Sequence, residues 1–319
     1  MGNHTHPMEF ILIGFSVMKE LRNVLFVPCL VLYLLMIAGN ATIVILICSD
    51  SRLHTPMYFF LCNFSVVEML VTSTVVPRML TDLIVEKNTI SFGGCLAQFY
   101  FFFSLGTTAF LLLAVMSIDR YVAICHPLRY STILSNNVCI QFVFASWVTS
   151  FFSMFPPTVF RARLLFCSSN RIDHFFCDNA PLLQLSCSDT HFIELWDFLL
   201  AILFILSSFM VTVASYIAII STILRIPSAT GRQKAFSTCA SHFVVVVIGY
   251  GTTIFTYVRP SKSYSTDMNK LVSLLTSIIT PFLNPFIFTL RNEKVKEVFR
   301  DRLEYLRAVF SLTGIPRCC

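Results

Sequence analysis

Long apolar runs recur along the chain, and short polar stretches separate them. Seven runs are close to, or longer than, the roughly 20 residues that an α-helix needs to cross about 30 Å of hydrocarbon. They cover residues 24–48, 57–80, 95–120, 138–160, 195–224, 235–258 and 270–290. The alternating pattern of a membrane barrel is missing, and a lone strand would leave its backbone groups unpaired in lipid. The pattern therefore predicts seven membrane-spanning helices.

The pattern changes after Leu290, where polar and charged residues become frequent. Apolar residues still recur at helical spacing, with basic residues on the other face: Val295, Val298, Phe299, Leu303 and Leu306. This is typical of a short helix that lies on a membrane surface. The predicted fold class is an all-α membrane protein, a seven-transmembrane helix bundle followed by an amphipathic helix.

Composition agrees with a chain that is solvated by lipid. Of the 319 residues, 56% are hydrophobic and only 13% are charged, whereas soluble domains have about 25% charged residues. The first residues lack the features of a cleaved signal peptide, so we expect the first span to direct insertion. No Gly/Ser-rich linker divides the chain. We expect one bundle, 24–290, between an N-terminal segment, 1–23, and a tail, 291–319.

The orientation in the membrane is predicted mainly from a glycosylation signal. Lys and Arg decide it only weakly, because much of the positive charge on the tail side follows the last span. Asn3-His4-Thr5 is an acceptor for N-glycosylation, which places the N-terminus outside the cell. An odd number of spans then makes the tail, with its amphipathic helix, cytoplasmic.

Four of the twelve cysteines lie on the same predicted side as Asn3: Cys95, Cys167, Cys177 and Cys187. In an oxidising compartment they form two disulfides, with three possible connectivities. A zinc site that also uses His174 is the alternative, but the spacing fits no closely spaced ligand pair. Disulfides are the favoured interpretation.

Two opposite charges, Asp119 and Arg120, end the third span. A charge in hydrocarbon is costly, so we expect both at the cytoplasmic water boundary, paired with each other or with a neighbouring helix. An ion pair that is released in a second state can act as a switch. The spacing alone favours a simpler interpretation, in which the pair only marks the end of the span.

The residues around this pair resemble the cytoplasmic signature of odorant receptors, a branch of the rhodopsin-like G-protein-coupled receptors. Asp119-Arg120-Tyr121 continues as Val-Ala-Ile-Cys-His-Pro-Leu-Arg-Tyr130. Other matching segments follow in order: Gly39-Asn40, Leu53-His-Thr-Pro-Met-Tyr-Phe-Phe-Leu61, Ser215-Tyr216, Lys234-Ala-Phe-Ser-Thr-Cys-Ala-Ser-His242, Pro281-Phe-Leu-Asn-Pro285 and Thr289-Leu-Arg-Asn292. The resemblance extends along the whole chain.

The resemblance implies an odorant receptor that binds small, mostly apolar volatile ligands and activates a heterotrimeric stimulatory G protein to raise cyclic AMP. It implies a multi-pass protein of the plasma membrane, in the cilia of olfactory neurons, with no enzymatic activity, no cofactor and no nucleic-acid partner. A non-olfactory chemosensor of the same family is the first alternative. A transporter is less consistent, because the chain has no internal repeat and no row of intramembrane charges.

The resemblance also assigns roles to individual residues at the cytoplasmic half. Coupling and switching are implied for Asp119, Arg120, Tyr216, Asn284 and Pro285. Phe288 departs from the family, which usually has tyrosine there. Glu68 replaces the common aspartate of the second span, and the family suggests a sodium site at this carboxylate. The longer side chain of Glu68 departs from the family's usual geometry.

A ligand cavity is expected in the outer half of the bundle. Residues at helical spacing form one stripe on the third span and another on the sixth: Phe103, Gly106, Thr107, Phe110, Tyr250, Thr253 and Tyr257. An apolar wall with a few polar groups suits a small apolar ligand, although ordinary helix packing shows the same residues.

The resemblance adds detail to this expected cavity. It places Phe204 and Ser277 in the wall, and it favours a Cys95–Cys177 bridge, leaving Cys167–Cys187, with Cys95–Cys187 as an open alternative. Phe102 stands where amine receptors carry an aspartate, which argues against an amine anchored by an ion pair at that position.

Overall fold

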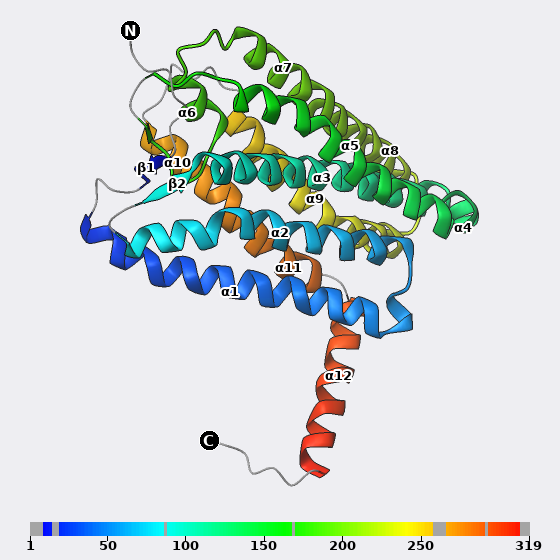
Figure 1. Ribbon diagram of the computed structural model, residues 1–319. Coiled ribbons are helices and arrows are strands. Elements are labelled where there is room, and N and C mark those ends of the chain that lie inside the picture. Colours follow the sequence, from blue (N-terminus) through cyan, green and yellow to red (C-terminus); the bar gives the residue numbers. More distant parts are fainter. Residues whose placement is uncertain are drawn as a thin grey trace.

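The computed structural model describes residues 9–14, 19–85, 88–167, 170–257, 266–290 and 293–312. Helices that lie side by side make up most of it (Figure 1). The first four spans are single helices: α1 Lys19–Ser49, α2 Pro56–Ile84, α3 Phe92–Cys125 and α5 Asn136–Ala162. The sixth span is α9, Ala229–Tyr257. All seven predicted apolar runs fall on helices, which confirms the predicted fold class.

The fifth and seventh spans each contain one wider, π-helical turn. The fifth consists of α7 His191–Ala201, η3 Ile202–Leu206 and α8 Ser207–Leu224. The seventh consists of α10 Thr266–Leu274, η4 Leu275–Ile279 and α11 Thr280–Leu290. Six helical segments of the described chain are long and apolar enough to cross a membrane, and α9 adds the shorter apolar stretch His242–Ile254.

The helix α12, Glu293–Leu312, points away from the bundle, across the direction of the spans (Figure 1). Its base is attached to the α1–α2 connection, where Arg52 Nη1 donates to Asp301 Oδ2 at 2.8 Å. Arg302 Nη2 donates to the carbonyl oxygen of Ser49 at 2.7 Å. We call this end of the bundle the tail end. An amphipathic helix in this position suits a membrane surface.

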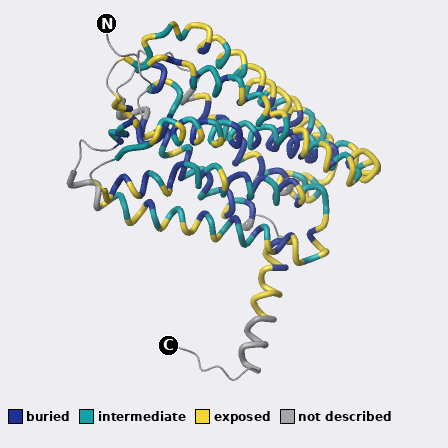
Figure 2. Tube along the Cα trace, in the orientation of Figure 1, coloured by how far each residue is buried: buried dark blue, intermediate teal, exposed yellow. Residues whose placement is uncertain are grey.

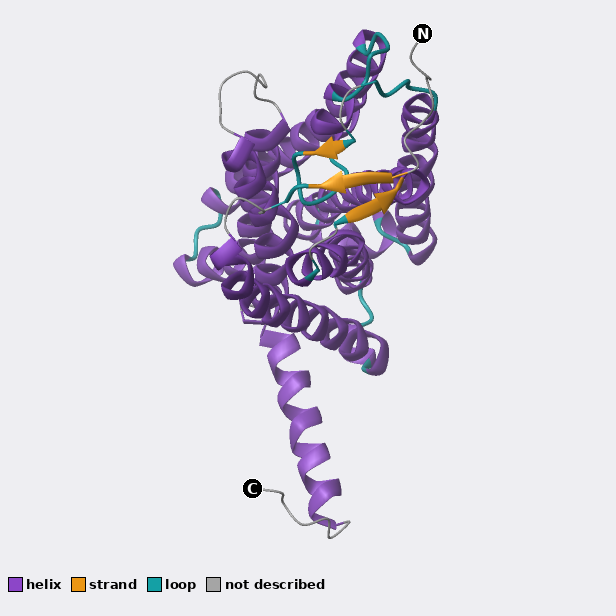
Figure 3. Cartoon of the chain, turned by 60° about the vertical axis from the view of Figure 1, so that its left-hand side comes forward, coloured by secondary structure: helices purple, strands orange, loops and turns teal. Residues whose placement is uncertain are grey.

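A small sheet covers the opposite end of the bundle, and the hydrophobic pattern did not predict it (Figure 3). It contains β1 Glu9–Leu12, β2 Thr89–Ser91 and β3 Arg171–Ile172. The central strand, β1, is antiparallel to β2 and parallel to β3. Phe10 and Leu12 of β1 are buried beneath it. We call this end of the bundle the sheet end.

Shorter helices complete the connections. On the tail side, η1 Ser51–Leu53 precedes α2, and η2 Pro127–Arg129 with α4 Tyr130–Ile133 follows α3. On the sheet side, α6 Asn179–Gln184 precedes α7. Pro56 occupies the first position of α2, where a helix needs no N–H donor. This local rule explains why α2 begins there.

Buried positions lie mainly on the interior side of the bundle (Figure 2). Many of the exposed residues are large and apolar. Phe144 and Phe152 on α5 are 67% and 76% exposed. An apolar surface of this kind would be costly in water but not against lipid tails. The inner core packs α1, α2, α3 and α5 against α9 and α11. The pattern of exposure therefore agrees with helices surrounded by lipid.

Candidate functional site

A cavity of about 390 Å³ lies between the helices in the half of the bundle toward the sheet end. Most of its wall comes from α2, α3, α7, η3, α9, η4 and α11, and α5 and α6 contribute one residue each. The lining is mostly apolar and aromatic, with a few polar side chains. Cavities of this size and polarity are typical of small-molecule sites.

Most of the residues predicted for the ligand site line this cavity. They are Phe103, Gly106, Thr107, Phe110, Phe204, Thr253 and Ser277. Tyr250 does not line it: the ring is buried behind Phe110, with the two ring centroids 5.1 Å apart. Tyr257 ends α9, and its side chain lies outside the described residues. The periodicity therefore selected the face of α3 that lines the cavity, while Tyr250 packs behind Phe110.

Two of these cavity-lining residues lie within the π-helical turns. Phe204 lies in η3, and Ser277 lies in η4. A π-helical turn adds a residue to a helix and so redirects the side chains around it, and such turns are frequent at functional sites. Ser277 is 5% exposed, and its Oγ has no hydrogen-bond partner in the described part of the chain.

Further lining residues were not among those predicted to bind the ligand. The aromatic ones include Phe99 and Phe102 on α3 and Phe198 on α7. The polar ones include Asn179, Glu194 and Asp197. Glu194 and Asp197 are three residues apart in the first turns of α7, which places them on one helical face. That spacing was the signal available in the sequence.

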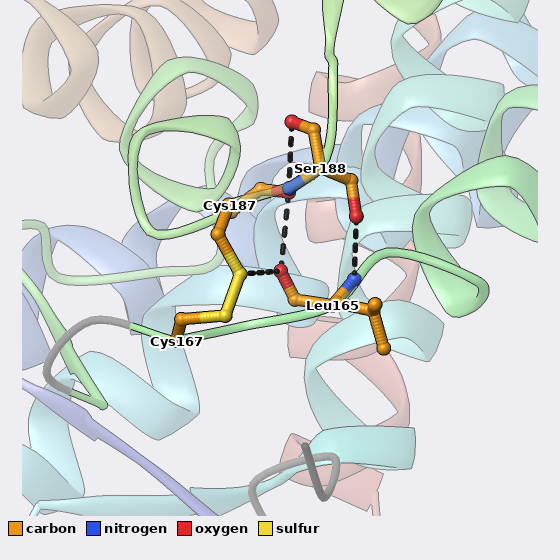
Figure 4. Close-up of a disulfide and its surroundings, with 5 residues drawn as sticks. Leu165, Cys167, Cys187 and Ser188 are labelled. Carbon is orange, nitrogen blue, oxygen red and sulfur yellow. Dashed lines mark hydrogen bonds between the residues drawn. A yellow bond between two sulfur atoms is a disulfide. The ribbon is translucent and has the colours of Figure 1, made fainter. Parts of the chain in front are cut away.

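Two disulfides hold the segment between α5 and α7 over the cavity. Cys95 at the start of α3 is joined to Cys177, as the family resemblance favoured, so the Cys95–Cys187 alternative is wrong. Cys167 is joined to Cys187 (Figure 4). Nearby, the carbonyl oxygen of Leu165 accepts a hydrogen bond from Cys187 N at 3.0 Å. With all four sulfurs in disulfides, the zinc alternative is also wrong.

Polar contacts join the same segment to the spans. The backbone N–H of Cys177 donates to Gln98 Oε1 at 3.0 Å, and Gln98 Nε2 donates to the carbonyl oxygen of Thr74 at 2.9 Å. Lys270 Nζ on α10 lies 2.5 Å from Asp173 Oδ1. Burial, helped by the nearby Lys270 charge, lowers the pKa of His174 to about 3. The segment is thus connected to α3 and α10.

Glu68 and Asn284 meet at the inner end of the cavity, and both line it. Asn284 Nδ2 donates to Glu68 Oε1 at 2.6 Å. Glu68 is 5% exposed, and its Oε2 has no partner in the described part of the chain, as also holds for Asn284 Oδ1. The structure therefore brings together two residues that are 216 positions apart.

Asp119 and Arg120 form a buried ion pair at the tail end of α3. Arg120 Nε donates to Asp119 Oδ2 at 2.9 Å, and Tyr130 Oη donates to the other carboxylate oxygen at 2.6 Å. One carboxylate thereby ties α3 to α4. The pair is more deeply buried than two residues that only mark a helix end.

Tyr216 on α8 contacts α9 next to this pair. Its hydroxyl lies 2.7 Å from His242 Nδ1, and the two rings are stacked. Pro285 lies within α11 against Gly39 of α1, where an added Cβ would come within 3.0 Å of the proline ring. Phe288, the residue that departs from the family pattern, is buried and packs edge-on against Phe64.

The predicted glycosylation site, Asn3, lies outside the described residues. Among the described residues, no group of three or more His, Cys, Asp or Glu side chains is arranged to hold a metal ion. The candidate site therefore consists of an apolar cavity with the polar pair Glu68 and Asn284 at its inner end. The charged pair Asp119 and Arg120 lies separately, at the tail end of the bundle.

Comparison with known proteins gives strong matches over nearly the whole chain. A family profile described as "Olfactory receptor" matches residues 29–304. Human olfactory receptor 6J1 is 52% identical over 311 residues, covering 97% of this chain and 90% of the relative. Human olfactory receptor 6S1 is 51% identical, covering 94% and 91%, and mouse olfactory receptor 6E1 is 49% identical, covering 95% and 97%.

Proposed function

Because the chain belongs to the olfactory receptor family, we propose that its cavity binds small, mostly apolar odorants and that binding activates a stimulatory G protein. Membership makes it a multi-pass membrane receptor, with odorant ligands and G-protein coupling. The cavity of about 390 Å³ supports the more specific proposal of an apolar ligand, since apolar side chains, several of them phenylalanine, make up most of its wall. Such a wall binds apolar molecules through burial of their surface.

The sheet end of the bundle is the extracellular end in this proposal. Both disulfides lie there, and disulfides persist in oxidising surroundings. Asn3 would be glycosylated on the same side. The tail end, with Arg120 and α12, then faces the cytoplasm and the G protein. The plasma membrane of olfactory cilia is the location that suits this activity.

An odorant acts by favouring one of two conformations of the receptor, an inactive one and an active one. In the inactive one, Arg120 is held by Asp119, and Tyr216 is held by His242. In the active one, both residues leave these partners and the tail end opens. A ligand shifts this equilibrium only by binding one state more tightly. Asn284 and Pro285 on α11 connect the inner end of the cavity to this movement.

Glu68 and Asn284 offer two buried oxygen atoms that have no partner in the described part of the chain. Oxygen ligands suit hard cations, so these residues fit a sodium ion, which would favour the inactive population. Raising extracellular sodium should then weaken the response to an odorant, and Glu68→Gln should remove that dependence. An equal sodium effect in both proteins would contradict the proposed site.

The proposed function is tested by measuring cyclic AMP in cells that display the receptor on their surface. A broad panel of volatile compounds is applied to the wild type and to Arg120→Ala, displayed at equal levels. We expect a dose-dependent rise in the wild type and none in the variant. A response that survives in Arg120→Ala would contradict the switch, and silence of a well-displayed wild type to every compound would contradict the function.

A further inference from the structure

The charged groups at the outer end of the cavity are carboxylates. Glu194 lies in the first turn of α7, and Asp197 follows one turn later. Both line the cavity, and they share it with Glu68 at the inner end. The described residues that line the cavity include no Lys, Arg or His. A ligand in this cavity therefore meets negative charge and hydrogen-bond acceptors.

The nearest positive charge, Arg161, is already used inside the protein. Its Nη2 donates to Asp197 Oδ2 and Asn179 Oδ1, and its Nη1 donates to the carbonyl oxygen of Pro157 at 2.9 Å. The guanidinium lies 4.2 Å from the centre of the Phe99 ring. Arg161 is completely buried and does not line the cavity. It balances Asp197 from behind and offers nothing to a ligand anion.

Within the part of the chain that the structure describes, Glu194 has no such partner charge. Its Oε1 accepts a hydrogen bond from Thr190 Oγ1 at 2.7 Å, which is a neutral contact. A carboxylate has about four acceptor sites, so this bond leaves most of them open. Glu194 is exposed, which lets it receive a ligand group at the outer end of the cavity.

An independent feature indicates that the cavity is built for a polar ligand group as well as an apolar one. Ser277 lines the cavity and is 5% exposed, and its Oγ has no partner in the described part of the chain. A buried hydroxyl without a partner is costly, and a bound ligand removes that cost.

We propose that the cavity prefers a small apolar molecule with a protonated amino group, held by Glu194 and Asp197, and that it disfavours ligands with a carboxylate. The amine would donate two or three hydrogen bonds to these acceptors, while its hydrocarbon part packs on Phe99, Phe102 and Phe198. The anchor comes from α7 and not from Phe102 on α3, where amine receptors have an aspartate. This inference rests on the proposed function of the cavity.

The test compares compounds that share a carbon skeleton and differ in one group: 2-phenylethylamine, 2-phenylethanol and phenylacetate, with hexylamine, hexan-1-ol and hexanoate as a second set. Near neutral pH the amines are protonated and the acids are ionised. Two readouts are used, cyclic AMP in cells and the thermal stabilisation of the purified receptor. We expect amines to act at roughly tenfold lower concentration than the alcohols and carboxylates to be weakest.

Substitutions test whether Glu194 is the residue responsible for the preference for amines. Glu194→Gln keeps the shape and should weaken amine binding roughly tenfold while changing alcohol binding by no more than about threefold. Asp189→Asn is the matched control, since Asp189 is a nearby acid that does not line the cavity. Asp197→Asn is a poorer test, because it leaves Arg161 buried without its counter-ion.

The outcomes separate this inference from the proposed function. A neutral odorant that activates the receptor, with amines no better than alcohols or acids, would overturn the inference and leave the function intact. An amine preference that persists in Glu194→Gln would overturn it too. A receptor that neither responds to nor is stabilised by any compound would overturn both.

Discussion

Asp119 holds two neighbours at once at the cytoplasmic end of α3. It pairs with buried Arg120 and accepts a hydrogen bond from half-buried Tyr130. Removing one partner of a buried ion pair leaves an unbalanced charge, which is far more costly than losing an exposed pair. A single carboxylate therefore has a large influence on whether Arg120 stays in place.

Asp119→Asn should raise basal cyclic AMP, because the neutral amide holds Arg120 less strongly. If the inactive state alone loses about 1.4 kcal/mol of stabilisation, the minor active population rises roughly tenfold. Tyr130→Phe removes one hydrogen bond and no charge, so its effect should be much smaller. The measurement is basal cyclic AMP at equal surface display. Equal basal activity in Asp119→Asn and the wild type would show that the pair is not a restraint.

His174 makes stability depend on pH. Burial lowers its pKa in the folded protein to about 3, compared with about 6.5 in an unfolded chain. Below pH 6.5 the unfolded chain binds a proton that the folded protein cannot, so this contribution to stability falls as pH falls. Between pH 6.5 and 5 the loss is about 2 kcal/mol.

The free energy of unfolding of His174→Phe, measured relative to that of the wild type, should therefore rise by about 2 kcal/mol when the pH is lowered from 7 to 5. The new ring can keep the stacking on Phe175. Thermal unfolding of the purified proteins at both pH values checks this. Asp178 acts in the opposite direction, since burial raises its pKa to about 6, so the comparison with wild type is essential. A variant that differs from wild type equally at both pH values would contradict the prediction.

At the scale of helices, local irregularities decide where side chains point. The π-helical turns η3 and η4 carry Phe204 and Ser277 to the cavity. Gly39 permits α1 to approach α11 at Pro285, since an added Cβ would lie 3.0 Å from the ring. This close approach is next to Asn284, whose side chain binds Glu68. The packing of α1 thus supports the inner end of the cavity.

Gly39→Ala should destabilise the protein by about 1–3 kcal/mol, the usual range when a tightly packed contact is overfilled. Gly251→Ala is the matched control, because a Cβ at Gly251 on α9 would meet nothing within 4 Å. Alanine there should be neutral or stabilising by up to about 1 kcal/mol. Thermal unfolding and surface display measure both. Equal stability of the two variants would mean that α1 can move away without cost.

At the scale of the whole molecule, the cavity and the switch are at different depths of one bundle. The cavity extends from Glu194 near the extracellular end to Glu68 and Asn284 at mid-depth. Arg120 lies further along, at the cytoplasmic end of α3. α3 contributes to both regions, so it could transmit ligand binding to the switch proposed at Arg120. Filling the cavity should therefore affect ligand response without breaking the fold.

Gly106→Leu should lower the potency of any activating odorant at least tenfold, because the new side chain takes up cavity space. A Cβ at Gly106 would meet nothing within 4 Å, so the substitution should be tolerated. Gly93→Leu, near the start of α3 and also in open space, is the control. Dose–response curves and thermal unfolding are measured together. Unchanged potency in a stable Gly106→Leu protein would place the ligand elsewhere.

The amino-acid sequence by itself determined the helices and indicated much of the cavity wall. Seven apolar runs of spanning length leave few structures other than helices, because lipid offers no partner to free backbone groups. The stripe from Phe103 to Phe110 identified the cavity face of α3 because helical periodicity is a local property. The family motifs added the pairing of Cys95 with Cys177, now seen in the structure.

Only the tertiary structure decided which distant residues meet. It showed that β1 pairs with strands from two other segments, that Tyr250 lies behind Phe110, and that Glu194 and Asp197 line a cavity backed by Arg161. Such contacts depend on how all the helices pack at once, and neither apolar periodicity nor local hydrogen bonding specifies them. The ligand preference inferred for the cavity follows from these contacts, since the charge that a ligand meets is the sum over side chains from separate spans.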